Sequence, residues 1–380
     1  MELKEYTFIV FGEEYHYNPL GVVRSLGEEG IRPIVIAYGG REHVVSSSRY
    51  VKRAHHVQTI EEGYRILKVM YCNSKRKSIL IVCDDVVTSY LDEHYDEIKD
   101  YFYFNNAGEC GRISKYQNKY ISNKLAEKCG VRIPKTWFVK RGEIPEDLEY
   151  PVLTKPISSY TGWKKDYYVC NSEKDLENAY KAIKCEEMLL QTYIKKKNEL
   201  CVDGIAWNQG KNVFVSIESL YTYLLPDYYS LEMTVNTFNN DEIQVFLEKM
   251  FEEIRFEGIF SMEFLIDDKD NKWFLEINYR NSTWSYASTK LGMNLPVLWA
   301  KGMVDGSIDK NARKQVSGNY IALAEIMDFD LRVRKYRYIN IFQWFIGVLK
   351  ADCLYVWNWK DLKPVVVAWF SKLARGIKRR

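Results

Sequence analysis

Histidine is scarce in this sequence of 380 residues, and all five histidines lie before residue 95. The longer, later part of the chain has no imidazole of its own, which excludes a Ser-His-Asp or Cys-His mechanism centred there. The eight cysteines are scattered, and the absence of C-x-x-C spacing argues against a zinc site. No apolar run approaches the ~18 residues of a membrane-spanning helix, and the N-terminal segment does not resemble a signal peptide. A long chain with unclustered cysteines is typical of a reduced, cytoplasmic protein.

Hydrophobic residues make up 47% of the sequence and charged residues 28%, which is the balance of a folded protein with two or three domains. The net charge is only +3, so a nucleic-acid partner is not expected. Charge is nevertheless uneven, because residues 331–380 contain 12 Lys or Arg and only two Asp or Glu. The same segment holds four of the ten tryptophans, and we expect it to have a role separate from that of the acidic body.

Alternating strand and helix patterns in the first 113 residues predict a parallel sheet of the Rossmann type. The first strand is not followed by a G-x-G-x-x-G sequence, so binding of NAD or FAD is not expected. Asp84 and Asp85 end the last of these strands, where they either meet a ligand such as a substrate ammonium group or cap the next helix. The expected strands cover 5–11, 31–37 and 78–83, and the expected helices cover 20–29 and 61–72.

The strongest local pattern is a hairpin of two strands, 259–266 and 272–278, joined by a polar turn. Pairing that is symmetric about the turn places Glu263 directly opposite Glu276, and Asn278 shares their face. Two like charges in this position repel each other unless a cation lies between them, and oxygen ligands suit Mg²⁺. The alternative is a pair of solvated acids on an exposed face.

Further motifs precede this hairpin in a fixed order. Asn118-Lys119 is followed by Gly130-Val-Arg-Ile-Pro134 and then by Pro151-Val-Leu-Thr-Lys155-Pro156. The strand-like Leu190-Gln191-Thr192-Tyr193-Ile194 precedes Glu199, and the hairpin ends in Glu276-Ile277-Asn278-Tyr279-Arg280. In order and spacing, from about 114 to 300, these motifs resemble the ATP-grasp superfamily of carboxylate–amine ligases.

The resemblance implies a role for each motif. Lys119 and Lys155 would neutralise ATP phosphates, and the catalytic residues would be Lys155 and Arg280, the latter by holding an acyl phosphate or the intermediate formed from it. Mg²⁺, or Mn²⁺ as the alternative, would be bound by Glu263, Glu276 and Asn278. The other nucleotide contacts would be Ser158, Ser159, Gln191, Tyr193, Ile194 and Glu199. For the lysines and Glu199 the alternative is a charge on the solvated surface.

The resemblance also implies a fold class, α/β combined with α+β. A Rossmann-like domain over 1–113 would precede an ATP-grasp domain over 114–310, and a basic, Trp-rich extension would cover 311–380. Within the ATP-grasp domain, 114–190 would be the central lid subdomain and 191–310 the metal-binding subdomain. The phosphate-covering loop departs from the family pattern, because Ser158-Ser-Tyr-Thr-Gly162 has a single glycine.

The implied activity is that of an ATP- and Mg²⁺-dependent ligase that activates a carboxylate as an acyl phosphate and joins it to an amine. Ile-Val-Cys-Asp-Asp at 81–85 and the segments 347–352 and 360–364 resemble D-aspartate-ligase-like and polysaccharide-cluster proteins of the superfamily. That likeness implies addition of an amino acid to a carboxylated cell-wall or capsular precursor, and it leaves a homodimer open. The alternatives are an inactive nucleotide-binding scaffold and a biotin-carboxylase-like enzyme, which would need histidines near the nucleotide.

The end of the sequence predicts a basic amphipathic helix over 365–380. Val366, Trp369 and Phe370 share one helical face, and Lys372 and Arg375 lie on the opposite face. Such a helix either lies on an anionic membrane as a peripheral contact or packs on the body of the protein.

Overall fold

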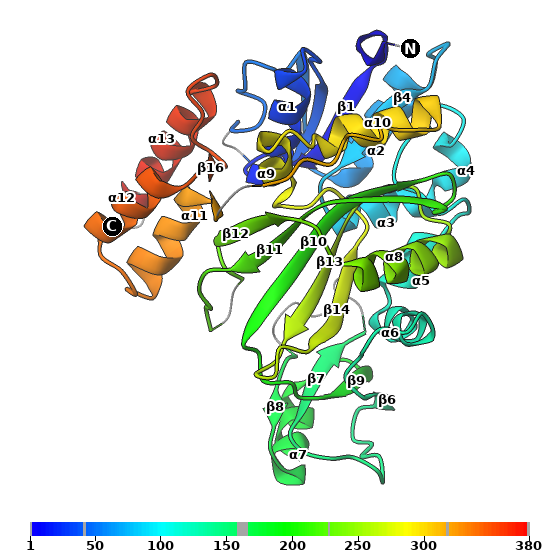
Figure 1. Ribbon diagram of the computed structural model, residues 1–380, viewed down its shortest axis with the longest axis vertical. Helices are drawn as coiled ribbons and strands as arrows, with labels where there is room; N and C mark the ends of the chain where they lie inside the picture. The colour runs from blue at the N-terminus through cyan, green and yellow to red at the C-terminus, as the bar shows by residue number, and fades with distance from the viewer. Residues whose placement is uncertain (1, 41–42, 158–165, 227–228, 317–318, 378–380) are drawn as a thin grey trace.

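A computed structural model of the chain describes residues 2–40, 43–157, 166–226, 229–316 and 319–377. The first part of the chain forms a parallel sheet with the strand order β3-β2-β1-β4-β5, at the top of Figure 1. Its strands are β1 (Phe8–Glu13), β2 (Ile34–Tyr38), β3 (Arg53–Val57), β4 (Ser78–Val82) and β5 (Phe102–Tyr103). Its helices are α1 (Tyr17–Glu28), α2 (Ile60–Ile66), α3 (Asp85–Glu93) and α4 (Tyr95–Ile98). The predicted Rossmann-type sheet is confirmed, with β3 as an additional polar edge strand.

Strand β1 is buried because helices cover both faces of this sheet. Ile9 and Phe11 pack in the core that includes Leu91 of α3, whereas Val10 packs on the opposite side with Leu20 of α1. A strand covered on both faces reads as a continuous apolar run, which is what residues 8–11 show. The carboxyl ends of β1 and β4 therefore meet at one edge of the sheet, beside the start of α3.

A second, antiparallel sheet has the order β6-β9-β7-β8 and lies at the bottom of Figure 1. It consists of β6 (Thr136–Lys140), β7 (Val152–Pro156), β8 (Val169–Cys170) and β9 (Glu187–Thr192), and α7 (Glu173–Ala182) packs on it through Leu176 and Ala179. Two helices, α5 (Arg112–Gln117) and α6 (Lys119–Lys128), connect it to the first sheet.

The largest sheet has the order β14-β13-β10-β11-β12-β15-β16 and crosses the middle of the molecule. Its strands are β10 (Asn198–Trp207), β11 (Asn212–Tyr221), β12 (Glu232–Thr237), β13 (Gly258–Ile266), β14 (Lys272–Asn278), β15 (Tyr320–Leu323) and β16 (Cys353–Leu354). Helix α8 (Asp241–Ile254) covers one face through Phe246 and Met250. The other face packs with α9 (Ser285–Lys290), α10 (Leu295–Asp305) and part of the N-terminal sheet's core.

The segment after residue 310 contacts both the large sheet and helix α1. It contains α11 (Glu325–Asp328), the π-helical turn η3 (Phe329–Lys335), α12 (Ile341–Lys350) and α13 (Lys363–Ile377), as well as β15 and β16 of the large sheet. Asp361 forms a fully buried ion pair with Arg24 of α1, with Nε and Oδ2 3.0 Å apart. No described helix combines the length and the apolar composition that crossing a membrane requires.

Candidate nucleotide and metal site

The strands of the hairpin β13–β14 pair as the sequence predicts at the two glutamates. Glu263 is directly opposite Glu276, and Ser261 is opposite Asn278. The register shifts by one residue immediately after Glu263, so that Phe264 pairs with Phe274 closer to the turn. The symmetric pairing is therefore confirmed for the acidic residues and wrong for the end of the hairpin near the turn.

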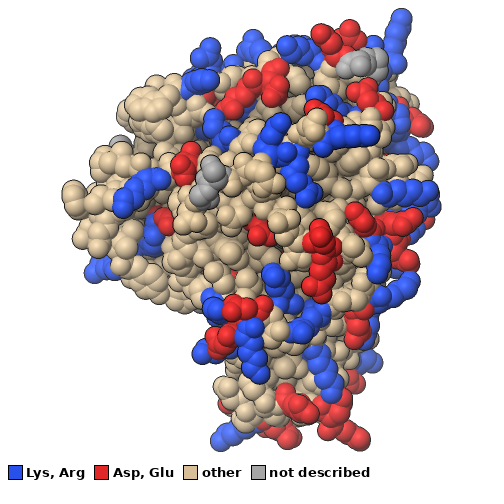
Figure 2. Space-filling view, viewed as in Figure 1, with Lys and Arg blue, Asp and Glu red and all other residues tan. Residues whose placement is uncertain are grey.

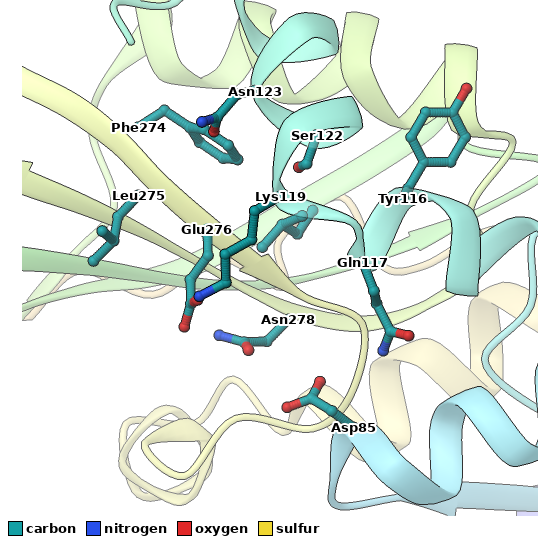
Figure 3. Close-up of a pocket in the computed structure, with 11 residues that line it drawn as sticks. Asp85, Tyr116, Gln117, Lys119, Ser122, Asn123, Phe274, Leu275, Glu276 and Asn278 are labelled. Carbon is teal, nitrogen blue, oxygen red and sulfur yellow. The ribbon is translucent and has the colours of Figure 1, made fainter. Parts of the chain in front are cut away.

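The two carboxylates of the hairpin have different partners. Glu276 Oε2 lies 3.2 Å from Lys119 Nζ (Figure 3). Glu263 Oε1 instead accepts a hydrogen bond of 3.1 Å from the Asn278 amide. The Lys119 ammonium lowers the pKa of Glu276, while burial and repulsion from Glu276 raise the pKa of Glu263 well above its usual range. Both side chains are half-buried, which excludes the alternative of solvated acids on an exposed face.

Lys119 reaches this site from the first turn of α6. The Asn118 side chain caps the helix by accepting from the amides of Tyr120 and Ile121, which fixes the direction in which the chain enters it. The Lys119 amide donates to the Ile157 carbonyl at 2.9 Å, and its ammonium donates to the Tyr167 hydroxyl at 3.1 Å. Burial lowers the pKa of Lys119, but Glu276 and Tyr167 together raise it above its ordinary value.

Lys155 differs from Lys119 because its described contact is neutral. It lies on β7, is only 7% exposed, and donates to Gln191 Oε1 of β9 at 2.5 Å. Burial, and then repulsion from Lys119, lower the pKa of Lys155 to about 7. Neither lysine is the solvated surface charge that the sequence left as an alternative.

Glu199 is buried at the start of β10 and is already hydrogen-bonded. Its carboxylate accepts from the Tyr221 hydroxyl at 2.5 Å and from Lys196 Nζ at 3.1 Å, so the alternative of a surface acid is wrong. Tyr193 and Ile194 follow β9 and are half-buried. The Tyr193 amide donates to the Pro151 carbonyl at 2.9 Å, which joins the residue after β9 to the residue before β7.

The two aspartates at the end of β4 differ in their surroundings, and one of them has the capping role that the sequence left open. Asp84 caps α3 by accepting from the Val87 amide at 2.8 Å, and burial raises its pKa to about 6. Asp85 instead turns toward the hairpin, with Oδ2 3.4 Å from Arg280 Nε. Asp85, Lys119, Glu276 and Asn278 line one pocket, so the N-terminal sheet contributes to the same site (Figure 3).

An imidazole approaches the site from the N-terminal sheet. His16 caps α1, where its Nδ1 accepts from the Asn18 amide at 3.1 Å. Burial, together with the nearby Arg280 guanidinium, lowers the pKa of His16 to about 4. The histidine count excluded an imidazole only from the later part of the chain, and folding brings a neutral one close to Arg280.

Asp203 is a site residue that the sequence reasoning missed. It lies on β10 opposite Ser261 and two residues from Cys201, which is paired with Glu263. Its side chain is fully buried on the face that carries Glu263, and burial raises its pKa to about 7, although Ser282 and Arg280 lower it. The available signal was the alternation of Glu199, Cys201 and Asp203 in an apolar strand. Ser158 and Ser159 lie outside the described residues.

The arrangement brings two antiparallel sheets together around paired acids and lysines, with a Rossmann-like sheet beside them. The chain has an ATP-grasp fold. A solved N5-carboxyaminoimidazole ribonucleotide synthetase in complex with ADP superposes with a TM-score of 0.66 at 14% identity, covering 86% of this chain and 84% of that one. An L-amino acid ligase from Bacillus licheniformis superposes with a TM-score of 0.60 at 12% identity, covering 78% and 73%.

Sequence comparison also finds ATP-grasp ligases. A D-aspartate ligase of Enterococcus faecium is 23% identical over 337 residues, which cover 78% of this chain and 76% of that protein. No protein-family model matches the sequence. The relatives and structural neighbours are thus ATP-grasp carboxylate–amine ligases, enzymes that form C–N bonds.

Asp203 makes a testable contribution to stability. Between the ordinary aspartate pKa near 3.8 and about 7, the folded protein binds a proton at Asp203 that the unfolded chain does not bind. The stability that this proton confers is therefore present at low pH and is lost as the pH rises through about 7. We expect Asp203→Asn to gain about 2–3 kcal/mol of unfolding free energy relative to wild type between pH 5 and pH 8, measured by urea denaturation. Parallel pH profiles for the two proteins would contradict this.

Proposed function

We propose that this chain is an ATP-dependent ligase that activates a carboxylate as an acyl phosphate and joins it to an amine. The observation that carries the proposal is the pairing of Glu263 with Glu276 beside Lys119, with Lys155 close by. A scaffold protein has no need of two half-buried acids in direct register, because their repulsion costs stability. The ATP-grasp ligases among its relatives support the same activity.

The two lysines and Arg280 act at different steps of the proposed reaction. Lys119 and Lys155 neutralise the phosphates of ATP while a carboxylate oxygen of the substrate attacks the γ-phosphorus and ADP leaves. Arg280 then holds the acyl phosphate by charge-assisted hydrogen bonds. The amine attacks the acyl carbon and loses a proton, and the tetrahedral adduct then expels phosphate to give the amide.

The donor set of the hairpin fits a divalent cation. Glu263 and Glu276 supply carboxylate oxygens from directly paired positions and Asn278 supplies an amide oxygen on the same face. Burial, and then repulsion from Glu276 and Glu199, raise the pKa of Glu263 well above its usual range, and a bound cation would oppose both effects. Glu263, Glu276 and Asn278 would hold Mg²⁺, or Mn²⁺ in its place, and the cation would supply stabilisation of the negative charge in the phosphoryl transfer.

The base and ribose of ATP would lie between the two antiparallel sheets. Gln191 lies near the end of β9, Tyr193 and Ile194 follow that strand, and Glu199 is the second residue of β10. The chain between these strands would therefore form the hinge of the site. A ribose hydroxyl would replace Lys196 on Glu199, because Lys196 is the more exposed of its two partners. Ser158 and Ser159 would cover the phosphates. The boundaries at 114, 191 and 311 remain our proposed domain limits.

We propose an amino acid as the amine and a carboxylated saccharide or peptide precursor of the cell wall or capsule as its partner, in the cytoplasm. The similarity to a D-aspartate ligase over three quarters of both chains supports an amino acid substrate. Asp85 supports the same choice, because it is 28% exposed in the pocket and can pair with an ammonium group. A homodimer is compatible with this assignment.

Phosphate release from Mg-ATP tests the activity. We expect wild-type protein to release phosphate only when a suitable amine and carboxylate are present, in a panel of D- and L-amino acids with carboxylated saccharides and peptides. Glu276→Gln should lower the rate at least about 100-fold, because it removes one of the paired charges. Glu248→Gln, an exposed change on α8, is the matched control and should keep the wild-type rate. Failure of wild-type protein to bind Mg-ATP would contradict the proposal and favour the scaffold.

The depressed pKa of Lys155 gives the nucleotide affinity a pH dependence. Because the free protein loses the Lys155 proton near pH 7 and the phosphates favour the charged form, ATP binding takes up a proton above that pH. We expect the Kd for Mg-ATP to rise about tenfold per pH unit above pH 7, measured by calorimetry. Lys155→Arg keeps its charge and should show a flat profile, whatever its absolute affinity. Equal slopes for the two proteins would rule out this role.

The C-terminal segment has an exposed apolar surface that supports a peripheral membrane contact. Its main part is one face of α12, where Ile341, Phe342, Phe345 and Leu349 are each more than half exposed. Phe370 of α13 is 68% exposed, whereas Trp369 is half-buried against the core, so the single face expected from the sequence is divided. Figure 2 shows that the flank formed by these helices is mostly free of charge, with Lys and Arg groups near it.

We propose that this surface, named here the α12 face, rests on an anionic lipid bilayer. An apolar helix face within a segment of net positive charge has the character of an interfacial helix rather than of a spanning one. A contact of this kind would suit an acceptor that is linked to a lipid. The side chains beyond residue 371 lie outside the described structure, so the α12 face carries the argument.

Vesicle flotation tests the α12 face. We expect wild-type protein to bind phosphatidylglycerol-containing vesicles more than phosphatidylcholine vesicles, with less binding at high salt. Phe342→Gln with Leu349→Gln should abolish most of the binding. Val69→Gln with Val245→Gln changes two exposed apolar residues elsewhere and should leave binding intact. Equal flotation of both double variants would contradict the assignment.

A further inference from the structure

Three potential metal ligands converge at the outer side of the N-terminal sheet, on a set of residues separate from the hairpin site. Glu14 directly follows β1, His43 lies in the connection between β2 and β3, and His56 lies on the edge strand β3. His56 is in register with Ala37 of β2, which is itself in register with Gly12. Glu14 is two residues beyond Gly12, so Glu14 and His56 share a face of the sheet.

The ligand atoms of these three residues lie close together. His43 Nδ1 and His56 Nδ1 are 3.1 Å apart, and His56 Nδ1 is 3.4 Å from Glu14 Oε2. Glu14 is 1% exposed, and its Oε2 has no hydrogen-bond partner among the described residues. A carboxylate oxygen buried in this way requires a compensating positive group.

Protons alone do not satisfy this cluster. Each imidazole nitrogen either carries one hydrogen or offers one lone pair, and Glu14 Oε2 only accepts. If His56 Nδ1 donates to Glu14, it offers no lone pair to His43; if it accepts from His43, it has no hydrogen to donate to Glu14 Oε2. With hydrogens on both nitrogens, the two hydrogens face each other across 3.1 Å. A cation at the centre satisfies all three atoms at once.

We propose that Glu14, His43 and His56 bind a divalent transition metal of the zinc class. Imidazole and carboxylate ligands suit Zn²⁺, which binds them at about 2.0–2.2 Å in a tetrahedral arrangement, and neighbouring ligand atoms of such a site lie about 3.3–3.5 Å apart. The two described separations, 3.1 and 3.4 Å, are close to this value. The fourth position faces solvent, because the His43 and His56 side chains are exposed.

The carboxylate of this cluster is held in orientation by the same connection that carries His43. Ser46 donates to Glu14 Oε1 twice, from its amide and from its hydroxyl, each at 2.9 Å. This leaves Oε2 to face the two histidines, which is the arrangement that metal-binding carboxylates adopt. Two residues further on, Ser48 and Arg49 bind Asp361, so the bound metal would fasten to β1 a connection that also anchors the C-terminal segment.

Cobalt titration tests this site independently of ligase activity. Tag-free full-length protein is stripped with a chelator and titrated with Co²⁺ in excess Mg²⁺, which occupies the hairpin acids, and tetrahedral Co²⁺ is detected by its visible absorption. We expect Co²⁺ to saturate one site per chain, and we expect Zn²⁺ to displace the bound Co²⁺. His43→Ala and His56→Ala should abolish the signal, and His94→Ala, a histidine of α3's C-terminal end, is the matched control that should keep it.

Two further variants separate this site from the ligase site and from misfolding. Glu276→Gln should leave Co²⁺ binding unchanged, and Glu14→Gln should remove it while keeping the hydrogen bonds to Ser46. Each variant is compared with wild type by its metal-free melting temperature, and Zn²⁺ should raise that temperature only where the three ligands are intact. Absence of saturable Co²⁺ binding to wild type, or undiminished binding to His43→Ala and His56→Ala, would overturn the proposal.

Discussion

The repulsion between two carboxylates in direct register is the constraint on which this site depends. Glu263 and Glu276 face each other because a hairpin with alternating side chains leaves them no other position. The surrounding structure compensates the two charges unequally. The Lys119 ammonium group pairs with Glu276, whereas Glu263 accepts a hydrogen bond from the neutral Asn278 amide. The hairpin by itself therefore carries unbalanced negative charge, and positively charged groups reach it from α6 and from Arg280, the second residue after β14.

The two lysines show how the same residue type acquires opposite properties. Lys119 sits against an acid and a phenol, so its positive charge is secured before any ligand arrives. Lys155 sits against a neutral amide in a buried strand, so its charge is conditional on an anion. A permanent and a conditional charge side by side let the empty site avoid the full repulsion between two ammonium groups.

The sequence predicted those features that depend on residues close together in the chain. The hairpin pairing could be read because strand alternation and a short turn determine it within twenty residues. Asp203 was missed because its importance comes from a neighbouring strand some sixty residues away. The zinc argument considered only cysteine spacing, whereas Glu14, His43 and His56 meet through the order of three strands. The division of the α13 face between core and solvent depended likewise on what packs beneath it.

The buried Arg24 has a consequence for how the chain is made. All the hydrogen bonds described for its guanidinium go to Tyr355, Val356 and Asp361, more than three hundred residues later. The ribosome synthesises helix α1 long before these acceptors, so the Arg24 guanidinium stays hydrated and unburied until the C-terminal segment has been made. Its final packing is a late event of synthesis, and a nascent chain released before that point would present an unfinished first domain.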